Sequence, residues 1–96
     1  MSPKNKIKLN KLRKKLDNID SQLLNLIKNR SEIVKKVLAL KAFKSEIVDK
    51  PRIKKILNKI KKESIKKKID PKITNRIWKN MIWSFIDYEK RNFKKK

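Results

Sequence analysis

The segment LRKKLDNIDSQLLNLIKNRSEIVKKVLALK, residues 12–41, decides the fold of this chain of 96 residues. Apolar side chains recur in it in alternating steps of three and four, the spacing of one helical face and of a heptad seam. The seam consists of Leu9, Leu12, Leu16, Ile19, Leu23, Leu26, Arg30, Ile33, Val37 and Leu40. Nine of these ten positions are aliphatic, and the tenth is the permanent cation Arg30. The pattern predicts a long helix whose seam holds a charge that needs an explanation.

This first helix is expected to run from about Asn5 to Phe43. At 1.5 Å per residue it would be a rod of about 57 Å. Such a rod is longer than a globule of 96 residues is wide, so a partner must lie along its apolar seam. The sequence therefore predicts a homodimer.

The segment KSEIVDKPR, residues 44–52, breaks the helical pattern and is expected to form a loop. Asp49 suits the N-cap of a second helix, with Pro51 tolerated in its first turn. This second helix should continue to about Lys67. Its apolar stripe consists of Ile53, Ile56, Leu57 and Ile60.

A second break, IDPK at residues 69–72, predicts a third helix capped by Asp70, with Pro71 at its first position. The apolar stripe of this helix consists of Ile73, Ile77, Trp78, Met81, Ile82 and Phe85, and it reaches Glu89 at its end. The expected fold is all-α, with one long and two shorter helices. We expect one domain over residues 1–96, with frayed ends at residues 1–4 and 94–96.

Composition excludes several classes of site. The chain has no cysteine, histidine or glycine, so it lacks thiolate metal ligands, the usual general base and Gly-rich phosphate loops. We expect no metal and no cofactor. No apolar run is long enough for a signal peptide or a membrane span, which predicts a cytoplasmic protein.

The chain is strongly basic, with 31 Lys and Arg against 9 Asp and Glu and a net charge of +22. A basic helical nucleic-acid-binding protein is one interpretation of this charge. The other is compositional drift toward lysine on solvated surfaces. Most of the cations are lysines scattered over all three predicted helices, which favours drift, with nonspecific nucleic acid binding at most.

Several charges fall where a core is expected. On a continuous helix Arg30 and Lys41 differ by about 20°, whereas Arg13 lies about 100° from Arg30 and faces elsewhere. In a dimer, that direction can be the cavity of the other subunit. Glu89 continues the apolar stripe of the third helix. There are two structural explanations for these charges. Arg30 could fix the register of the seam, or Arg30 and Glu89 could form a buried salt bridge.

Asp49 and Arg52 at the start of the second helix favour a ligand instead. Burying several cations with few acids is costly unless an anion fills the site, and the sequence predicts a small dianion. We therefore expect replacement of Arg30 or Lys41 to relieve repulsion rather than to break a bond.

Three groups of residues resemble the all-helical (type II) chorismate mutases over nearly the whole chain. These are LRKKLDNIDSQLLNLIKNR at residues 12–30, the following Lys41, and DKPR at residues 49–52. The ending IWKNMIWSFIDYE, residues 77–89, resembles the third helix of one bacterial branch. The resemblance implies an intertwined homodimer with two shared active sites. It also implies the Claisen rearrangement of chorismate to prephenate in phenylalanine and tyrosine biosynthesis.

The resemblance also implies a role for each charged position. Arg30 and, from the partner chain, Arg13 would bind the substrate, and Lys41 would contact a carboxylate and the ether oxygen. Asp49 would hold the substrate hydroxyl through its backbone, and Arg52 would be a further site arginine. Glu89 would donate a hydrogen bond to the ether oxygen.

Two positions depart from the family pattern. Ile53 replaces the usual glutamate after the D..R arginine, and Phe85 replaces a usual serine. An isochorismate pyruvate lyase of the same fold therefore stays open as an alternative to the mutase. The nucleic-acid-binding interpretation ranks third, because it offers no reason for Arg30 on the seam.

Overall fold

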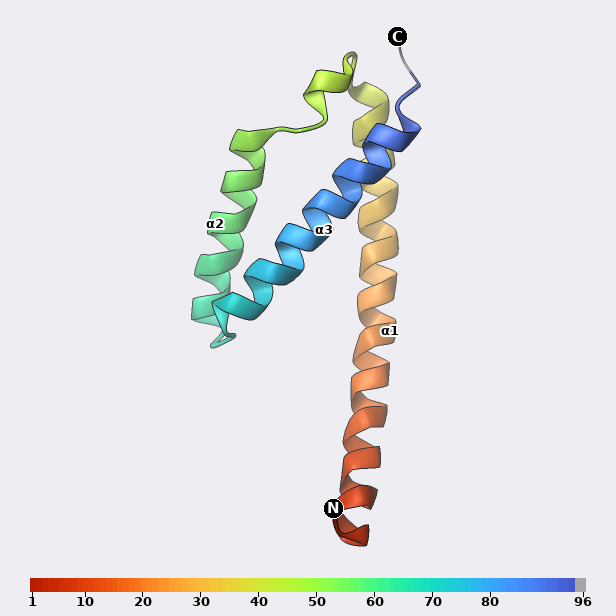
Figure 1. Ribbon diagram of the computed structural model, residues 1–96, viewed down its shortest axis with the longest axis vertical. Coiled ribbons are helices and arrows are strands. Elements are labelled where there is room, and N and C mark those ends of the chain that lie inside the picture. Colours follow the sequence, from red (N-terminus) through yellow and green to blue (C-terminus); the bar gives the residue numbers. More distant parts are fainter. Residues whose placement is uncertain (95–96) are drawn as a thin grey trace. The chain divides into compact units, whose positions relative to one another are not determined.

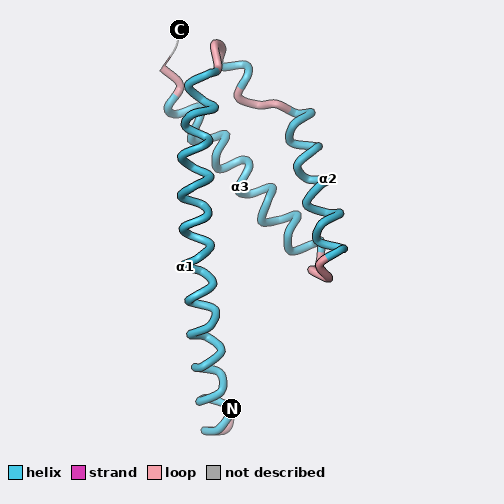
Figure 2. Tube along the Cα trace, turned by 180° about the vertical axis from the view of Figure 1, so that it is seen from behind, coloured by secondary structure: helices cyan, strands magenta, loops and turns pink. Residues whose placement is uncertain are grey.

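The computed structural model describes residues 1–94, and these form α-helices and one short 3-10 helix, without any strand (Figure 1). In chain order the elements are α1 (Pro3–Leu40), η1 (Lys44–Glu46), α2 (Lys50–Lys66) and α3 (Pro71–Asn92). Figure 2 shows the same elements coloured by type. The prediction of an all-α chain with one long and two shorter helices is confirmed.

The chain divides into two units, Met1–Ile33 and Val34–Lys96. The first unit consists of most of α1, and the second contains the end of α1 with η1, α2 and α3. Fraying was predicted for residues 94–96, of which Lys95 and Lys96 lie outside the described residues. The fraying of residues 1–4 and the single domain remain predictions.

Helix α1 begins two residues earlier than expected, at Pro3 rather than Asn5. The Ser2 hydroxyl accepts a hydrogen bond from the backbone N–H of Asn5 at 3.2 Å, and Pro3 occupies the first helical position. Serine and proline are favoured at these two positions because the first N–H groups of a helix have no partner within it. A Ser-Pro start signal therefore sets this boundary.

The apolar seam of the first unit is exposed within the single chain. Five of its side chains are between 49% and 62% exposed: Leu12, Leu16, Ile19, Leu23 and Leu26. No residue of α1 is fully buried. A row of large aliphatic side chains in water is typical of a surface that another protein covers.

The prediction that the first helix extends to Phe43 was wrong, because α1 ends at Leu40. The backbone N–H of Lys41 bonds to the Leu38 carbonyl at 3.1 Å, so the last turn tightens before the chain leaves the helix. Residues 41–43 carry no glycine or proline, so no local signal marks this end.

The core of the second unit forms where the loop before α2 meets α3. Ile47 lies directly after η1 and is buried together with Ile82 and Ile86 of α3. Partly buried apolar side chains surround this cluster: Leu38, Val48, Ile53, Ile56, Leu57 and Phe93. A loop residue is thus among the most buried in the unit, and it fixes the loop against α3.

Helices α2 and α3 lie side by side and antiparallel, joined by a short turn (Figure 1). Asp70 caps α3 as predicted, accepting from the backbone N–H of Lys72 at 2.9 Å. The turn itself follows the Schellman pattern, with Ile69 N–H bonded to Ser64 O and Lys68 N–H bonded to Ile65 O. Lys68 has a φ of 58°, in the left-handed region that usually takes glycine.

Two hydroxyls join α2 and α3 near this turn. Ser64 Oγ and Thr74 Oγ1 are both buried and lie 2.7 Å apart, and Ser64 also donates to the Ile60 carbonyl. Because buried polar groups are costly without partners, this pair fixes the register of the two helices.

No helix of the described chain is long and apolar enough to cross a membrane.

Candidate active site

Lys41 and Glu89 form an ion pair inside the second unit. Lys41 follows the last residue of α1, and Glu89 lies near the end of α3. The distance from Lys41 Nζ to Glu89 Oε2 is 2.6 Å, and the two side chains are only 16% and 9% exposed. A charge-assisted hydrogen bond this short and this well shielded from water holds both groups in place.

The loop after Lys41 is fixed by Glu46. One of its carboxylate oxygens, Oε1, accepts from the backbone N–H groups of Ala42 at 3.2 Å and Phe43 at 2.9 Å. The buried side chain of Ile47 follows at once. The loop is therefore held by a carboxylate at one point and by the core at the next, and both points lie within six residues of Lys41.

Asp49 begins α2 in the predicted way. Its Oδ1 accepts from the backbone N–H of Arg52 at 3.0 Å, and Pro51 lies in the first turn. The Asp49 carboxylate therefore has a capping role. The Arg52 side chain is exposed, and its backbone is fixed by the cap.

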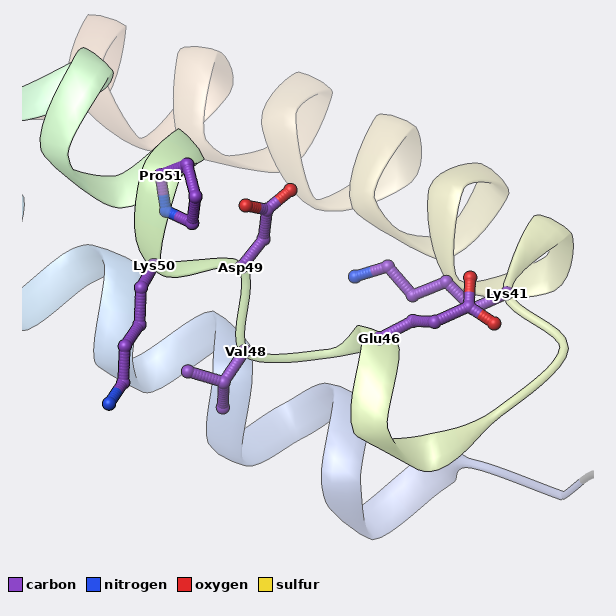
Figure 3. A pocket seen from close by; sticks show the side chains of 6 residues that line it. All are labelled: Lys41, Glu46, Val48, Asp49, Lys50 and Pro51. Carbon is purple, nitrogen blue, oxygen red and sulfur yellow. The ribbon is translucent and has the colours of Figure 1, made fainter.

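An open depression of about 620 Å³ lies at this corner, lined by Lys41, Glu46, Val48, Asp49, Lys50 and Pro51. Figure 3 shows the Lys41 side chain pointing from the end of α1 toward Asp49 at the start of α2. The structure thus brings three of the predicted site residues together, because Lys41 and Asp49 line the depression and Glu89 holds the Lys41 ammonium. Arg52 is not among the lining residues.

The remaining two predicted residues belong to the first unit. Arg13 is exposed on α1, and Arg30 is partly buried. The expectation that Lys41 shares a helical face with Arg30 was wrong in its premise. Because α1 ends at Leu40, helical geometry does not set the direction of the Lys41 side chain. That direction is set by the bond to Glu89.

The expectation that Lys41 lacks a protein partner was also wrong. In the second unit its ammonium bonds to Glu89, so removing it would break a bond. Sequence reasoning missed Glu46 and Ile47 as well. An acidic residue followed by two apolar ones in a short loop was the available signal, but it does not say what the carboxylate binds.

The described residues contain no group of three or more acidic side chains that could hold a metal ion. What they contain is a shielded lysine–glutamate pair beside an open depression, which is lined by one further cation, Lys50, and by the carboxylates of Glu46 and Asp49. Such an arrangement can place one ammonium group and one carboxyl group next to a polar ligand.

The family model for type II chorismate mutases matches residues 12–90 of the chain. The chain belongs to this family. The matched segment covers most of the 96 residues and includes all six predicted site positions, from Arg13 to Glu89. A search of curated proteins and a search of solved structures gave no match. Membership in the chorismate mutase family supports activity of the chorismate mutase type.

Proposed function

We propose that the protein is a chorismate mutase, an isomerase that converts chorismate to prephenate on the route to phenylalanine and tyrosine. The family match over residues 12–90 carries this proposal. The shielded pair of Lys41 and Glu89 beside an open depression supports it, because a dianionic substrate needs a cation that is held in place.

The chemistry of the reaction suits the composition of the chain. In a Claisen rearrangement the ether C–O bond breaks and a C–C bond forms within one molecule, so no co-reactant gains or loses electrons. The reaction needs neither a nucleophile nor a base, and the chain has no cysteine or histidine. Catalysis then depends on holding a compact conformer and on stabilising charge at the ether oxygen.

In this proposal Lys41 and Glu89 act on the ether oxygen. A lysine ammonium has three donors, so Lys41 can bond to Glu89 and still bond to a substrate carboxylate and the ether oxygen. Glu89 contributes a hydrogen bond to the same oxygen when its carboxyl group carries a proton. Arg30 binds a carboxylate of the substrate.

The other proposed contacts orient the substrate. Asp49 uses its carboxylate as a helix cap, so its proposed contact with the substrate hydroxyl comes from the backbone. Arg52 contributes its exposed guanidinium. Arg13 of the partner subunit completes the site.

The proposed assembly is an intertwined homodimer, one chorismate mutase domain per chain, working in the cytoplasm. The aliphatic row of α1 supports the dimer, because large apolar side chains that are 49% to 62% exposed are typical of a surface that another protein covers. This row consists of Leu12, Leu16, Ile19, Leu23 and Leu26. A second copy of the same helix would present a matching apolar row. The sharing of Arg13 between subunits would follow from that arrangement.

An isochorismate pyruvate lyase is the second candidate. It would use the same cationic pocket and release pyruvate from isochorismate to leave salicylate. Ile53 and Phe85 favour keeping this candidate, because they place apolar side chains where the family usually has a glutamate and a serine. The two activities differ in substrate and in product.

Incubation of the purified protein with chorismate, followed by chromatography of the products, tests the proposal. Prephenate formed by the wild-type protein and lost in a Lys41→Ala preparation is the expected result. The variant, purified in parallel, controls for contaminating host mutase. Salicylate from isochorismate, with no prephenate from chorismate, would replace the mutase with the lyase.

A further inference from the structure

A basic groove runs between α2 and α3. Two of its lining residues border the candidate active site, since Lys50 also lines the depression beside Lys41 and Ile53 lies at a family site position, and the proposed mutase chemistry gives the others no role. The groove consists of two adjoining depressions of about 510 and 290 Å³, which share Leu57, Asn58 and Asn75. The remaining lining residues are Lys50, Ile53, Lys54, Lys61, Pro71, Lys72, Lys79 and Trp83. We call this surface the α2–α3 groove.

Five lysines and no acidic residue line the α2–α3 groove. On α2, Lys50, Lys54 and Lys61 follow one another in steps of four and seven, which keeps them on one face. On α3, Lys72 and Lys79 are seven residues apart. The row on α2 extends over about 16 Å, so the positive charge follows a line rather than a point.

Trp83 gives this groove a second property. Its side chain is 52% exposed, although tryptophan carries a large apolar ring. It lines the larger depression together with Lys54 and Lys79. An exposed indole between lysines is the combination with which proteins bind single-stranded nucleic acid, since a base stacks on the ring and phosphates meet the ammonium groups.

Other anionic partners fit less of this surface. A small dianion would use two of the five lysines and leave the rest of the groove unoccupied. An acidic peptide would match the charge but would bring no flat ring to Trp83. Lysines are point charges without the planar fork of arginine, so they match a phosphate backbone without reading its sequence.

We propose that the α2–α3 groove binds single-stranded nucleic acid without sequence preference, with phosphates on its lysines and a base on Trp83. This binding is separate from the proposed mutase reaction. On this proposal nucleic acid binds at one defined site, whereas the net positive charge alone would attract it to the whole surface.

A matched pair of charge variants tests the place of binding. Lys54→Gln/Lys79→Gln removes two charges from the groove, and Lys55→Gln/Lys59→Gln removes two from exposed positions of α2 that do not line it. Lys50 is left in place because it also lines the depression beside Lys41. Binding of a fluorescent oligothymidylate of about 15 nucleotides is measured by anisotropy at several salt concentrations.

The groove variant should bind at least about tenfold more weakly than the control variant at low salt. Its slope of log affinity against log salt should fall by about 1.4, because each lost phosphate contact on a single strand contributes about 0.7. Equal losses in the two variants would overturn the proposal, since binding would then follow net charge alone.

Tryptophan fluorescence tests the stacking. In Trp78→Phe protein Trp83 is the one tryptophan, and oligothymidylate should quench its emission, whereas the Trp78 emission of Trp83→Phe protein should stay unchanged. This readout does not require an alanine variant to fold. Quenching of Trp83 by polyglutamate or inorganic polyphosphate to the same degree would overturn the choice of nucleic acid, as would no quenching at all.

Discussion

Lys41 Nζ lies 2.6 Å from Glu89 Oε2, and this bond joins the residue that follows α1 to the last turns of α3. Both side chains are mostly shielded from water. The pair therefore has a structural role in the second unit and, in the proposed mutase, a chemical one. The two roles can be separated because one is measured by unfolding and the other by turnover.

Replacing Lys41 by alanine should reduce both stability and activity. The free energy of unfolding should fall by about 1–3 kcal/mol, because the Glu89 carboxylate loses its charged partner at a mostly buried position. Turnover should fall by about 10²–10³, the usual effect of removing one group that stabilises developing charge. Urea unfolding and initial rates with chorismate measure the two effects.

Lys44→Ala is the matched control for Lys41, because Lys44 is an exposed lysine three residues further along the loop. The Lys44→Ala variant should keep the free energy of unfolding and the turnover of the wild type. A Lys41→Ala protein with normal turnover would remove Lys41 from the proposed mechanism, whatever its stability.

Replacing Glu46 by alanine should loosen the loop that follows Lys41. Two backbone N–H groups, those of Ala42 and Phe43, would lose their acceptor, at a cost of about 1 kcal/mol or more. Turnover should fall several-fold, while Glu46→Gln, which keeps an acceptor oxygen, should recover most of it. Glu63→Ala, at an exposed position of α2, is the control.

The three helices could be predicted from the sequence because their signals are local. Asp49 and Asp70 cap their helices through atoms two or three residues away. The end of α1 at Leu40 could not be predicted, since Lys41, Ala42 and Phe43 are all compatible with a helix. The contact that follows this end, the burial of Ile47 against Ile82 and Ile86 of α3, is long-range and has no local signal.

The candidate site could be predicted in part for the same reason. Lys41, Asp49 and Glu89 were expected from spacing and resemblance, but the bond between Lys41 and Glu89 joins residues 48 positions apart. Periodicity carries no information on such pairs. The burial of Ser64 with Thr74, and of Ile86 rather than the exposed Ile77, likewise depends on how α2 meets α3.

Replacing Lys68 by glycine should stabilise the fold. Lys68 has a φ of 58°, and a residue with a Cβ atom costs about 1–2 kcal/mol in this region relative to glycine. Part of that gain is lost because glycine is more flexible in the unfolded chain. We expect a net gain of about 1 kcal/mol and a melting temperature higher by about 4–8 °C.

Lys68→Ala is the control for the Lys68→Gly variant, and it should leave the melting temperature close to that of the wild type. Thermal scans at one fixed protein concentration are required, because a dimer gains stability with concentration. A Gly variant no more stable than the Ala variant would contradict the backbone explanation.

The shared active site can be tested by mixing two inactive proteins. Arg13→Ala and Arg30→Ala homodimers should each lose most activity, since every site would lack one arginine. After subunit exchange a heterodimer contains one site with both arginines intact and one site with neither. Activity should therefore recover in the mixture, and light scattering should give the mass of a dimer for all species.

The control is the Arg30→Ala protein alone, taken through the same exchange procedure, and it should stay inactive. Continued inactivity of the mixed proteins, once exchange has been verified with a tagged subunit, would argue against an arginine from the partner chain. A monomeric mass at micromolar concentration would contradict the dimer directly.

Glu89 leads to the last prediction, which concerns the hydrogen bond proposed from its side chain to the ether oxygen. The amide of Glu89→Gln always carries N–H donors, and the side chain of Glu89→Ala carries none. Turnover of chorismate should therefore be at least that of the wild type in Glu89→Gln and about 10²–10³ lower in Glu89→Ala.

Both variants also remove the charged partner of Lys41, so urea unfolding must be measured alongside turnover. Loss of the ion pair should lower the free energy of unfolding in both variants, whereas loss of the donor should lower turnover in Glu89→Ala alone. Equal turnover in the wild type and in both variants would remove Glu89 from the mechanism and leave it only its structural bond to Lys41.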